Sequence, residues 1–199
     1  MTLFGLFTYT FAFLLALSIH EYAHGAASYR LGDPTPAYAG RLSLNPLSHL
    51  DFLGTLAFIV SLQAGVGFGW AKPVPVDPRY YRDYKKGLLL VGLAGPLANF
   101  TLAVFFSIPL KLGLVTNIWI EFLYINILIN ISLGVFNLIP VPPLDGSKVL
   151  YGLLPHRYTY RWHKFEQYGP IILLLLLFTG TISQIVFPLI RIVQRIILF

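Results

Sequence analysis

The feature that most constrains this chain is a histidine pair, His20 and His24, which follows a run of apolar or small residues from 3 to 19. A run of that length is typical of a membrane-spanning helix. Residues four apart lie on one face of a helix, so both imidazoles can reach one metal ion. Glu21 lies about 100° round the helix from His20, where it can act on a metal-bound water without being a ligand. His-Glu-x-x-His is a zinc-protease pattern, and ionisable groups within an apolar span usually mark a functional site.

Charged residues make up 11% of the 199 residues and hydrophobic residues 56%, whereas soluble domains carry about 25% charged residues. We therefore expect one membrane-embedded domain over residues 1–199, with a catalytic core at about 1–150 and a C-terminal interfacial segment and helix at 151–199. The net charge of +6 resides in short loops between apolar runs, which indicates the positive-inside pattern rather than a nucleic-acid surface. The absence of cysteine excludes disulfides, thiolate zinc sites and cysteine nucleophiles.

Four apolar runs are long enough to cross a bilayer, at residues 2–29, 88–112, 118–139 and 170–188. A fifth run, 52–68, is marginal in length and contains Gly54, Gln63, Gly65 and Gly67. If it crossed, the strongly basic loop at 70–86 would lie on the opposite side from the loop at 30–50. We therefore expect the fifth run to be re-entrant or interfacial. The loops at 30–50, 70–86 and 140–169 then share the cytoplasmic side of the cell membrane, and the active site lies towards that side.

The stretch Arg41-Leu42-Ser43-Leu44 alternates polar and apolar residues, which predicts a short strand and half of a β-hairpin near the active site. An extended substrate segment could pair with such a strand. The expected fold is therefore an all-α polytopic membrane protein with about four transmembrane helices, one re-entrant or interfacial segment and a short β-hairpin.

Catalytic zinc usually takes three protein ligands and a water, so the histidine pair needs a third ligand. The candidates near the ends of spans are Asp145, Asp51, His49 and Glu166. Asp145 fits best, because it follows a proline-rich break on the same side as His24 and is followed by a glycine that lets the backbone approach closely. A Leu-Asp-Gly stretch is also common in ordinary turns and helix caps.

Three further polar residues have more than one interpretation each. Asn137 and Asn99 lie in apolar runs, where an amide either bonds a neighbouring helix or contacts the substrate backbone and the oxyanion. The two interpretations are balanced for Asn137, whereas helix packing near Gly95 is favoured for Asn99. His49 is an alternative ligand, a proton relay beside the site or a surface histidine.

Several motifs, taken in order, make the chain resemble the site-2 protease family of intramembrane zinc metalloproteases. They are His20-Glu21-Tyr22-Ala23-His24, Asn45-Pro46-Leu47-Ser48-His49, Gly69-Trp70-Ala71-Lys72-Pro73-Val74-Pro75-Val76, Gly95-Pro96-Leu97-Ala98-Asn99 and Asn137-Leu138-Ile139-Pro140-Val141-Pro142-Pro143-Leu144-Asp145-Gly146. The resemblance covers roughly residues 10–150 and is to the compact branch without PDZ or CBS domains. It implies that His20, His24 and Asp145 bind one zinc ion, that Glu21 is the catalytic base, and that the substrates are transmembrane proteins cleaved in regulated intramembrane proteolysis.

Two other classes of function compete with a protease. A zinc transporter would need further ligands along a path across the bilayer, and the spans after residue 88 offer few. A catalytically silent membrane scaffold would not need Glu21. The Gly-x-Ser-Gly motif of serine intramembrane proteases and the Gly-x-Gly-Asp motif of aspartyl ones are both missing from the sequence.

Overall fold

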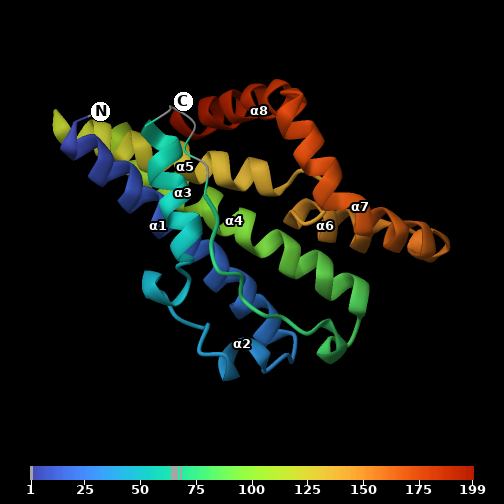
Figure 1. Cartoon of the computed structure of the whole chain (residues 1–199). Helices are drawn as coiled ribbons and strands as arrows, with labels where there is room; N and C mark the ends of the chain where they lie inside the picture. Colours follow the sequence, from blue (N-terminus) through green and yellow to red (C-terminus); the bar gives the residue numbers. More distant parts are fainter. Residues whose placement is uncertain (1, 64–66, 68) are drawn as a thin grey trace.

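The computed structural model describes residues 2–63, 67 and 69–199, and the described residues fold into helices joined by turns and loops (Figure 1). The α-helices are α1 Leu3–Arg30, α2 Thr35–Tyr38, α3 Phe52–Gln63, α4 Tyr84–Lys111, α5 Ile118–Asn137, α6 Asp145–Leu153, α7 Thr159–Phe178 and α8 Thr181–Leu198. Short 3₁₀ turns lie at Pro46–Ser48, Pro78–Tyr80 and His156–Tyr158. This architecture confirms the all-α prediction.

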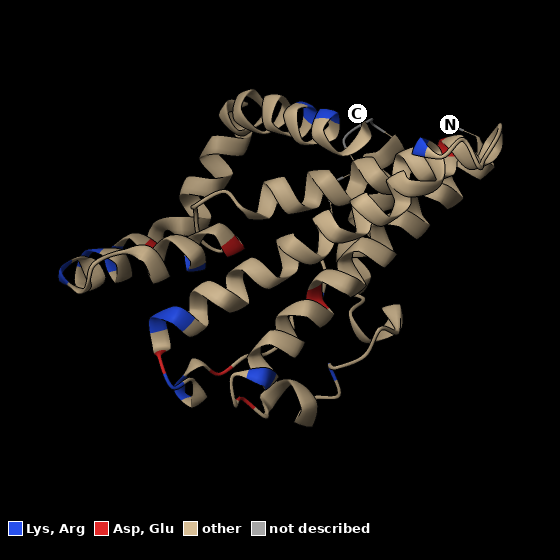
Figure 2. Ribbon diagram, turned by 180° about the vertical axis from the view of Figure 1, so that it is seen from behind, with Lys and Arg blue, Asp and Glu red and all other residues tan. Residues whose placement is uncertain are grey.

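Within the described ranges, α1, α4, α5 and α8 are long and apolar enough to cross a membrane. The first three pack side by side, and α4 also contacts α6 (Figure 1). Small residues allow this close packing, since Ala16 and Ala103 are fully buried between the helices. Both termini lie at one end of the bundle, while Lys and Arg gather mainly at the other end, around the starts of α4 and α7 (Figures 1 and 2).

The prediction of a fourth continuous span at residues 170–188 is wrong. The helix breaks at Thr179 and Gly180, and Gly180 has a φ of 71°, a left-handed conformation that glycine adopts without strain. Residues 159–178 and 181–198 therefore form two helices, and the apolar face of α8, with Ile182, Val186 and Ile190, packs into the core beside α5.

The predicted non-crossing segment matches α3, which ends at Gln63. Twelve residues of α-helix extend about 18 Å, well short of the roughly 30 Å hydrocarbon core of a bilayer. The Phe58 ring of α3 stacks on Phe13 of α1 with a centroid distance of 3.7 Å, which holds α3 against the bundle. The rest of the predicted 52–68 segment, at 64–66 and 68, lies outside the described residues.

The predicted β-hairpin is wrong for the residues that the structure describes. Residues 41–45 take no regular structure, and the described β-pairing is an isolated antiparallel bridge between Leu50 and Ala71. Side chains, rather than a partner strand, bond backbone carbonyls of this loop. The His49 Nε2 atom lies 2.7 Å from the Ser43 carbonyl, and Arg41 donates to the Ser48 carbonyl.

Candidate metal centre

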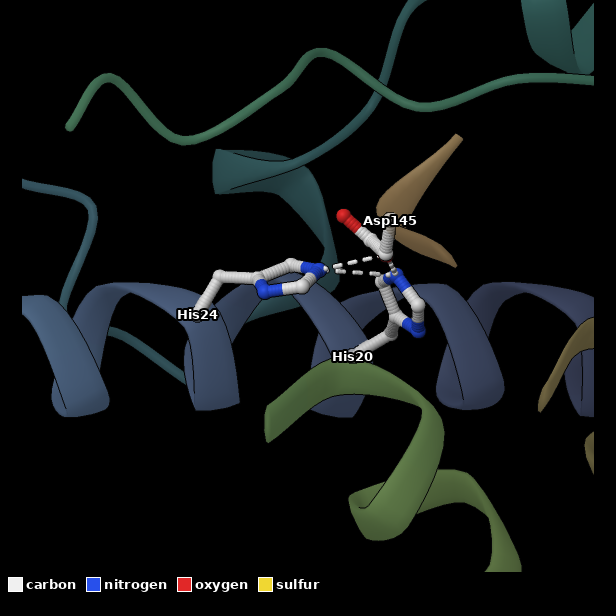
Figure 3. Close-up of side chains that lie close together, drawn as sticks. All are labelled: His20, His24 and Asp145. Atoms are coloured by element: carbon white, nitrogen blue, oxygen red, sulfur yellow. Dashed lines mark hydrogen bonds and ion pairs between the residues drawn. The ribbon is translucent and has the colours of Figure 1, made fainter. Parts of the chain in front are cut away.

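Three side chains from two helices converge in one group (Figure 3). His20 and His24 project from α1, and Asp145 is the first residue of α6. The Asp145 Oδ2 atom lies 3.0 Å from His20 Nε2 and 2.9 Å from His24 Nε2, and the two Nε2 atoms lie 3.0 Å apart. All three side chains are buried. The described residues contain this one group of three side chains that could hold a metal ion.

Glycines make this convergence sterically feasible. A Cβ on Gly92 of α4 would lie 3.0 Å from both the Asp145 carbonyl and the Lys148 Cβ, so a bare backbone lets α6 approach α4. A Cβ on Gly95, one turn further along α4, would lie 2.5 Å from His24 Nε2 and 2.7 Å from His20 Nε2. The two imidazole rings therefore rest directly on the backbone of α4.

The other ring nitrogen of each histidine is also bonded. His24 Nδ1 lies 2.7 Å from the Val91 carbonyl, and His20 Nδ1 lies 2.6 Å from Asn99 Oδ1. A carbonyl oxygen can only accept, so Nδ1 of His24 carries the proton and its Nε2 presents a lone pair. Partners of this kind fix the ring orientation of metal-binding histidines.

The three facing atoms form a donor set that one metal ion could bind. With both Nδ1 atoms protonated, two imidazole lone pairs and a carboxylate oxygen of Asp145 face one another at about 3 Å. Neutral imidazoles in that tautomer bring no proton to share, so three acceptors would repel one another. A divalent metal ion would bind all three, and two histidines with one carboxylate are a donor set of catalytic zinc sites. The residues present therefore fit zinc.

Lys148 holds the second oxygen of the Asp145 carboxylate, with Nζ 2.9 Å from Oδ1. Burial disfavours the ionised form of the Asp145 carboxyl and raises its pKa, whereas the positive charge of Lys148 favours that form and lowers the pKa. Because Oδ1 is taken by Lys148, Oδ2 is the oxygen that points into the group.

Glu21 lies next to His20 but outside the group of facing donor atoms. Its half-buried carboxylate accepts a hydrogen bond at Oε2 from the Val74 N–H, at 2.8 Å. Val74 is itself buried and packs close to Gly25 of α1, where an added Cβ would lie 3.2 Å from Val74 Cγ1. The loop before α4 therefore runs over α1 and fixes the Glu21 carboxylate.

The structure places the rival third ligands elsewhere. Asp51 accepts from the Gly54 N–H at 2.8 Å near the start of α3, and Glu166 is exposed beside His163 on α7. His49 is buried in the loop that it organises through the Ser43 carbonyl. None of these three belongs to the described metal-binding group.

Asn99 and Asn137 have different partners in the structure. Asn99 bonds the neighbouring helices through the Ala16 carbonyl and Asn130, in agreement with the favoured helix-packing role, and it also contacts His20 directly. Asn137, half-buried at the end of α5, donates from Nδ2 to the Leu133 carbonyl of its own helix at 3.0 Å. Sequence reasoning missed Asn130, which bonds Asn99, and Lys148. An asparagine within an apolar span and a lysine three residues after Asp145 were the available signals.

Comparison with known proteins gives matches that extend beyond this site. The family described as Peptidase family M50 matches residues 109–179. YwhC of Bacillus subtilis is 35% identical over 187 residues, 89% of this chain and 83% of its own length. Rip2 of Mycolicibacterium smegmatis is 31% identical over 190 residues, 89% of this chain and 69% of its own length. Both are named as candidate zinc metalloproteases.

MJ0392 of Methanocaldococcus jannaschii, named a zinc metalloprotease, is 37% identical over 76 residues, 38% of this chain and 22% of its own length. No solved structure matches the chain. The similarity to YwhC spans most of both chains, so it is not limited to one motif. The chain therefore belongs to peptidase family M50, the site-2 protease family of membrane zinc metalloproteases.

Proposed function

We propose that this protein is an intramembrane protease that hydrolyses peptide bonds of transmembrane proteins, with one zinc ion per chain held by His20, His24 and Asp145. The observation that carries the proposal is the buried convergence of two imidazole Nε2 atoms and one carboxylate oxygen, which together could bind one metal ion. The four candidate spans among the described residues and the family membership support a site that acts within the membrane.

A zinc ion held there would polarise the scissile carbonyl and lower the pKa of a bound water to about 7. Glu21 then acts as the general base, because it neighbours a ligand without being one. Val74 holds its Oε2 atom, while Oε1 accepts no hydrogen bond from the described residues. Oε1 takes a proton from the attacking water and later delivers it to the leaving amine as the C–N bond breaks.

The substrate segment has to unwind before cleavage, since the amides of a helix are hydrogen-bonded and hidden within it. Asn137 is the proposed contact to the substrate carbonyl. An amide nitrogen carries two hydrogens, and the Leu133 carbonyl takes one of them. The other remains for the oxyanion that forms as water attacks.

The direct test of this function is Glu21→Gln. We expect the variant to retain zinc but to lose cleavage by roughly 10²–10⁴-fold, since the general base alone is removed. The protein and its variant are co-expressed with candidate single-span proteins, and cleavage and trapped substrates are compared. Glu166→Gln is the matched control, because it makes the same change at an exposed side chain of α7. Cleavage by Glu21→Gln at the wild-type rate would refute the mechanism.

A zinc transporter is the remaining candidate of another class, and zinc flux into liposomes that contain the purified protein separates the two. We expect no flux above that of empty liposomes. A flux that Glu21→Gln leaves unchanged would favour transport, because passage of an ion does not need the base.

We further propose that the zinc site faces the cytoplasm from the cell membrane and that α3 does not cross the bilayer. The chain has no native cysteine, so single cysteines report their side cleanly. Cysteines that replace Ser43, Arg79 and Tyr158 should be shielded from an impermeant reagent outside intact cells, and one that replaces Thr116 should react. Labelling of the Arg79 position from outside would overturn this topology.

A further inference from the structure

A row of buried amides leads from the middle of α5 to the candidate metal centre. Asn126, Asn130 and Asn99 are each 0% exposed. Asn130 Nδ2 donates to the Asn126 carbonyl at 2.9 Å, and Asn99 Nδ2 donates to Asn130 Oδ1 at 3.0 Å. Asn99 Nδ2 also donates to the Ala16 carbonyl at 3.0 Å, and Asn99 Oδ1 lies 2.6 Å from His20 Nδ1. The row thus joins α5, α4 and α1.

Backbone carbonyls at two points determine the direction of every hydrogen bond in this row. A side-chain amide can present either end to a neighbour, whereas a carbonyl can only accept. The Asn126 carbonyl requires Nδ2 of Asn130, so Oδ1 of Asn130 faces Asn99. The Ala16 carbonyl and that Oδ1 together take both amide hydrogens of Asn99. Reversal of either amide would set oxygen against oxygen in a dry interior, where an unpaired polar group is costly.

The direction of the row decides which nitrogen of His20 carries a proton. Asn99 has only its oxygen left for His20, so Nδ1 has to donate and Nε2 presents its lone pair to Asp145 Oδ2 and His24 Nε2. His24 needs no such support, because the Val91 carbonyl sets its tautomer directly. We propose that Asn130, acting through Asn99, is a positioning residue that selects the zinc-binding tautomer of His20. The inference rests on the proposed zinc site.

The row also contains its own control. Asn126 contributes its backbone carbonyl, whereas its side-chain Oδ1 is buried and finds no partner among the described residues, and its Nδ2 bonds the Phe122 carbonyl. The side chain of Asn126 can therefore be replaced without a change in the direction of the row. Asn126 and Asn130 lie one turn apart on α5 and are equally buried, so the same substitution at both positions separates tautomer selection from general packing.

The experiment measures the zinc dissociation constant of the purified protein by competition with a chelator. Loss of a partner that orients a metal-binding histidine typically weakens metal affinity about 10–100-fold. We expect that loss for Asn99→Leu, and a smaller one for Asn130→Leu because the Ala16 carbonyl still takes one amide hydrogen of Asn99. Asn130→Asp should keep wild-type affinity, since a neutral buried carboxyl both accepts from Asn99 and donates to the Asn126 carbonyl. Asn126→Leu should leave affinity unchanged.

A ¹⁵N spectrum of histidine-labelled, zinc-loaded protein supplies a readout that packing alone would not change. The His20 signals are assigned by their loss in His20→Ala. Wild type should show a protonated Nδ1 on His20, and Asn130→Leu should add a second form in which Nδ1 lacks the proton. If Asn130→Leu does not fold, Asn99→Asp against Asn99→Leu makes the same distinction, because only the former keeps an acceptor for His20.

Two results would overturn the inference while leaving the zinc site intact. The first is wild-type zinc affinity and a single His20 tautomer in Asn130→Leu. The second is equal weakening by Asn130→Leu and Asn126→Leu, which would show a general packing effect. A wild-type protein that binds no zinc would overturn the proposed site and this inference together.

Discussion

Gly95→Ala is the substitution whose effect on the candidate metal centre follows most directly from the structure. The added methyl group would lie 2.5 Å from His24 Nε2, 2.6 Å from His20 Cε1 and 2.7 Å from His20 Nε2. All three distances are shorter than van der Waals contact, and the atoms concerned are the two proposed ligand nitrogens and a carbon of the His20 ring. Both rings are also tethered at Nδ1, so they cannot turn away without breaking the bonds to Val91 and Asn99.

Overpacking of this kind costs about 1–3 kcal/mol. If the strain falls on the zinc-bound geometry, zinc affinity weakens by roughly 5–150-fold, since each 1.4 kcal/mol is tenfold. Chelator competition measures the affinity, and thermal unfolding of the detergent-solubilised protein measures stability. The control is Gly134→Ala, whose methyl group would meet the Phe100 ring at 2.7 Å. It should lose stability but not zinc affinity. Wild-type zinc affinity in Gly95→Ala would refute the reasoning.

Three further predictions concern Lys148, Val74 and Asp33. Lys148→Met should weaken zinc binding, because the Asp145 carboxylate loses the partner that turns Oδ2 inward. Lys148→Arg should restore zinc affinity, and equal affinities in both variants would contradict this. Val74→Pro removes the N–H that holds Glu21 and should lower the cleavage rate with zinc content unchanged, whereas Val74→Ala should not. Hydrogen bonds outweigh burial and lower the pKa of Asp33 below 3.8, so its ionised form stabilises the fold above that pH and the contribution is lost on acidification towards the lower folded pKa. The thermal unfolding midpoint should therefore fall less steeply on acidification in Asp33→Asn than in wild type.

The part of the site on α1 could be predicted from the sequence because it is local. A long apolar run predicts a helix, and helix geometry then places His20 and His24 on one face wherever the helix lies. The choice of Asp145 needed more, namely the side of the membrane on which each apolar run ends. Neither the positive-inside pattern nor the motif order contains distances, so the contact of Lys148 with one carboxylate oxygen of Asp145 could not be foreseen.

The errors arose where tertiary contacts decide between local alternatives. A single glycine, Gly180, divides an apolar stretch that hydropathy treats as continuous, and the segment after it uses its apolar face to pack on α5. The alternating residues 41–44 have strand character, but a strand needs a partner strand. Here the side chain of His49 bonds the Ser43 carbonyl that a partner strand would otherwise bond. An asparagine in a span signals a hydrogen bond, yet nothing local to Asn130 identifies Asn99 as its partner.

The zinc K-edge X-ray absorption spectrum of the purified protein tests the central claim most directly. We expect zinc with two imidazole nitrogens and carboxylate or water oxygens at about 2.0–2.2 Å. We also expect the loss of one imidazole contribution in His24→Ala and no change in His49→Ala, since His49 lies outside the group. A spectrum without imidazole ligands, or one that His49→Ala changes and His24→Ala does not, would contradict the assignment of His20, His24 and Asp145 as the zinc site.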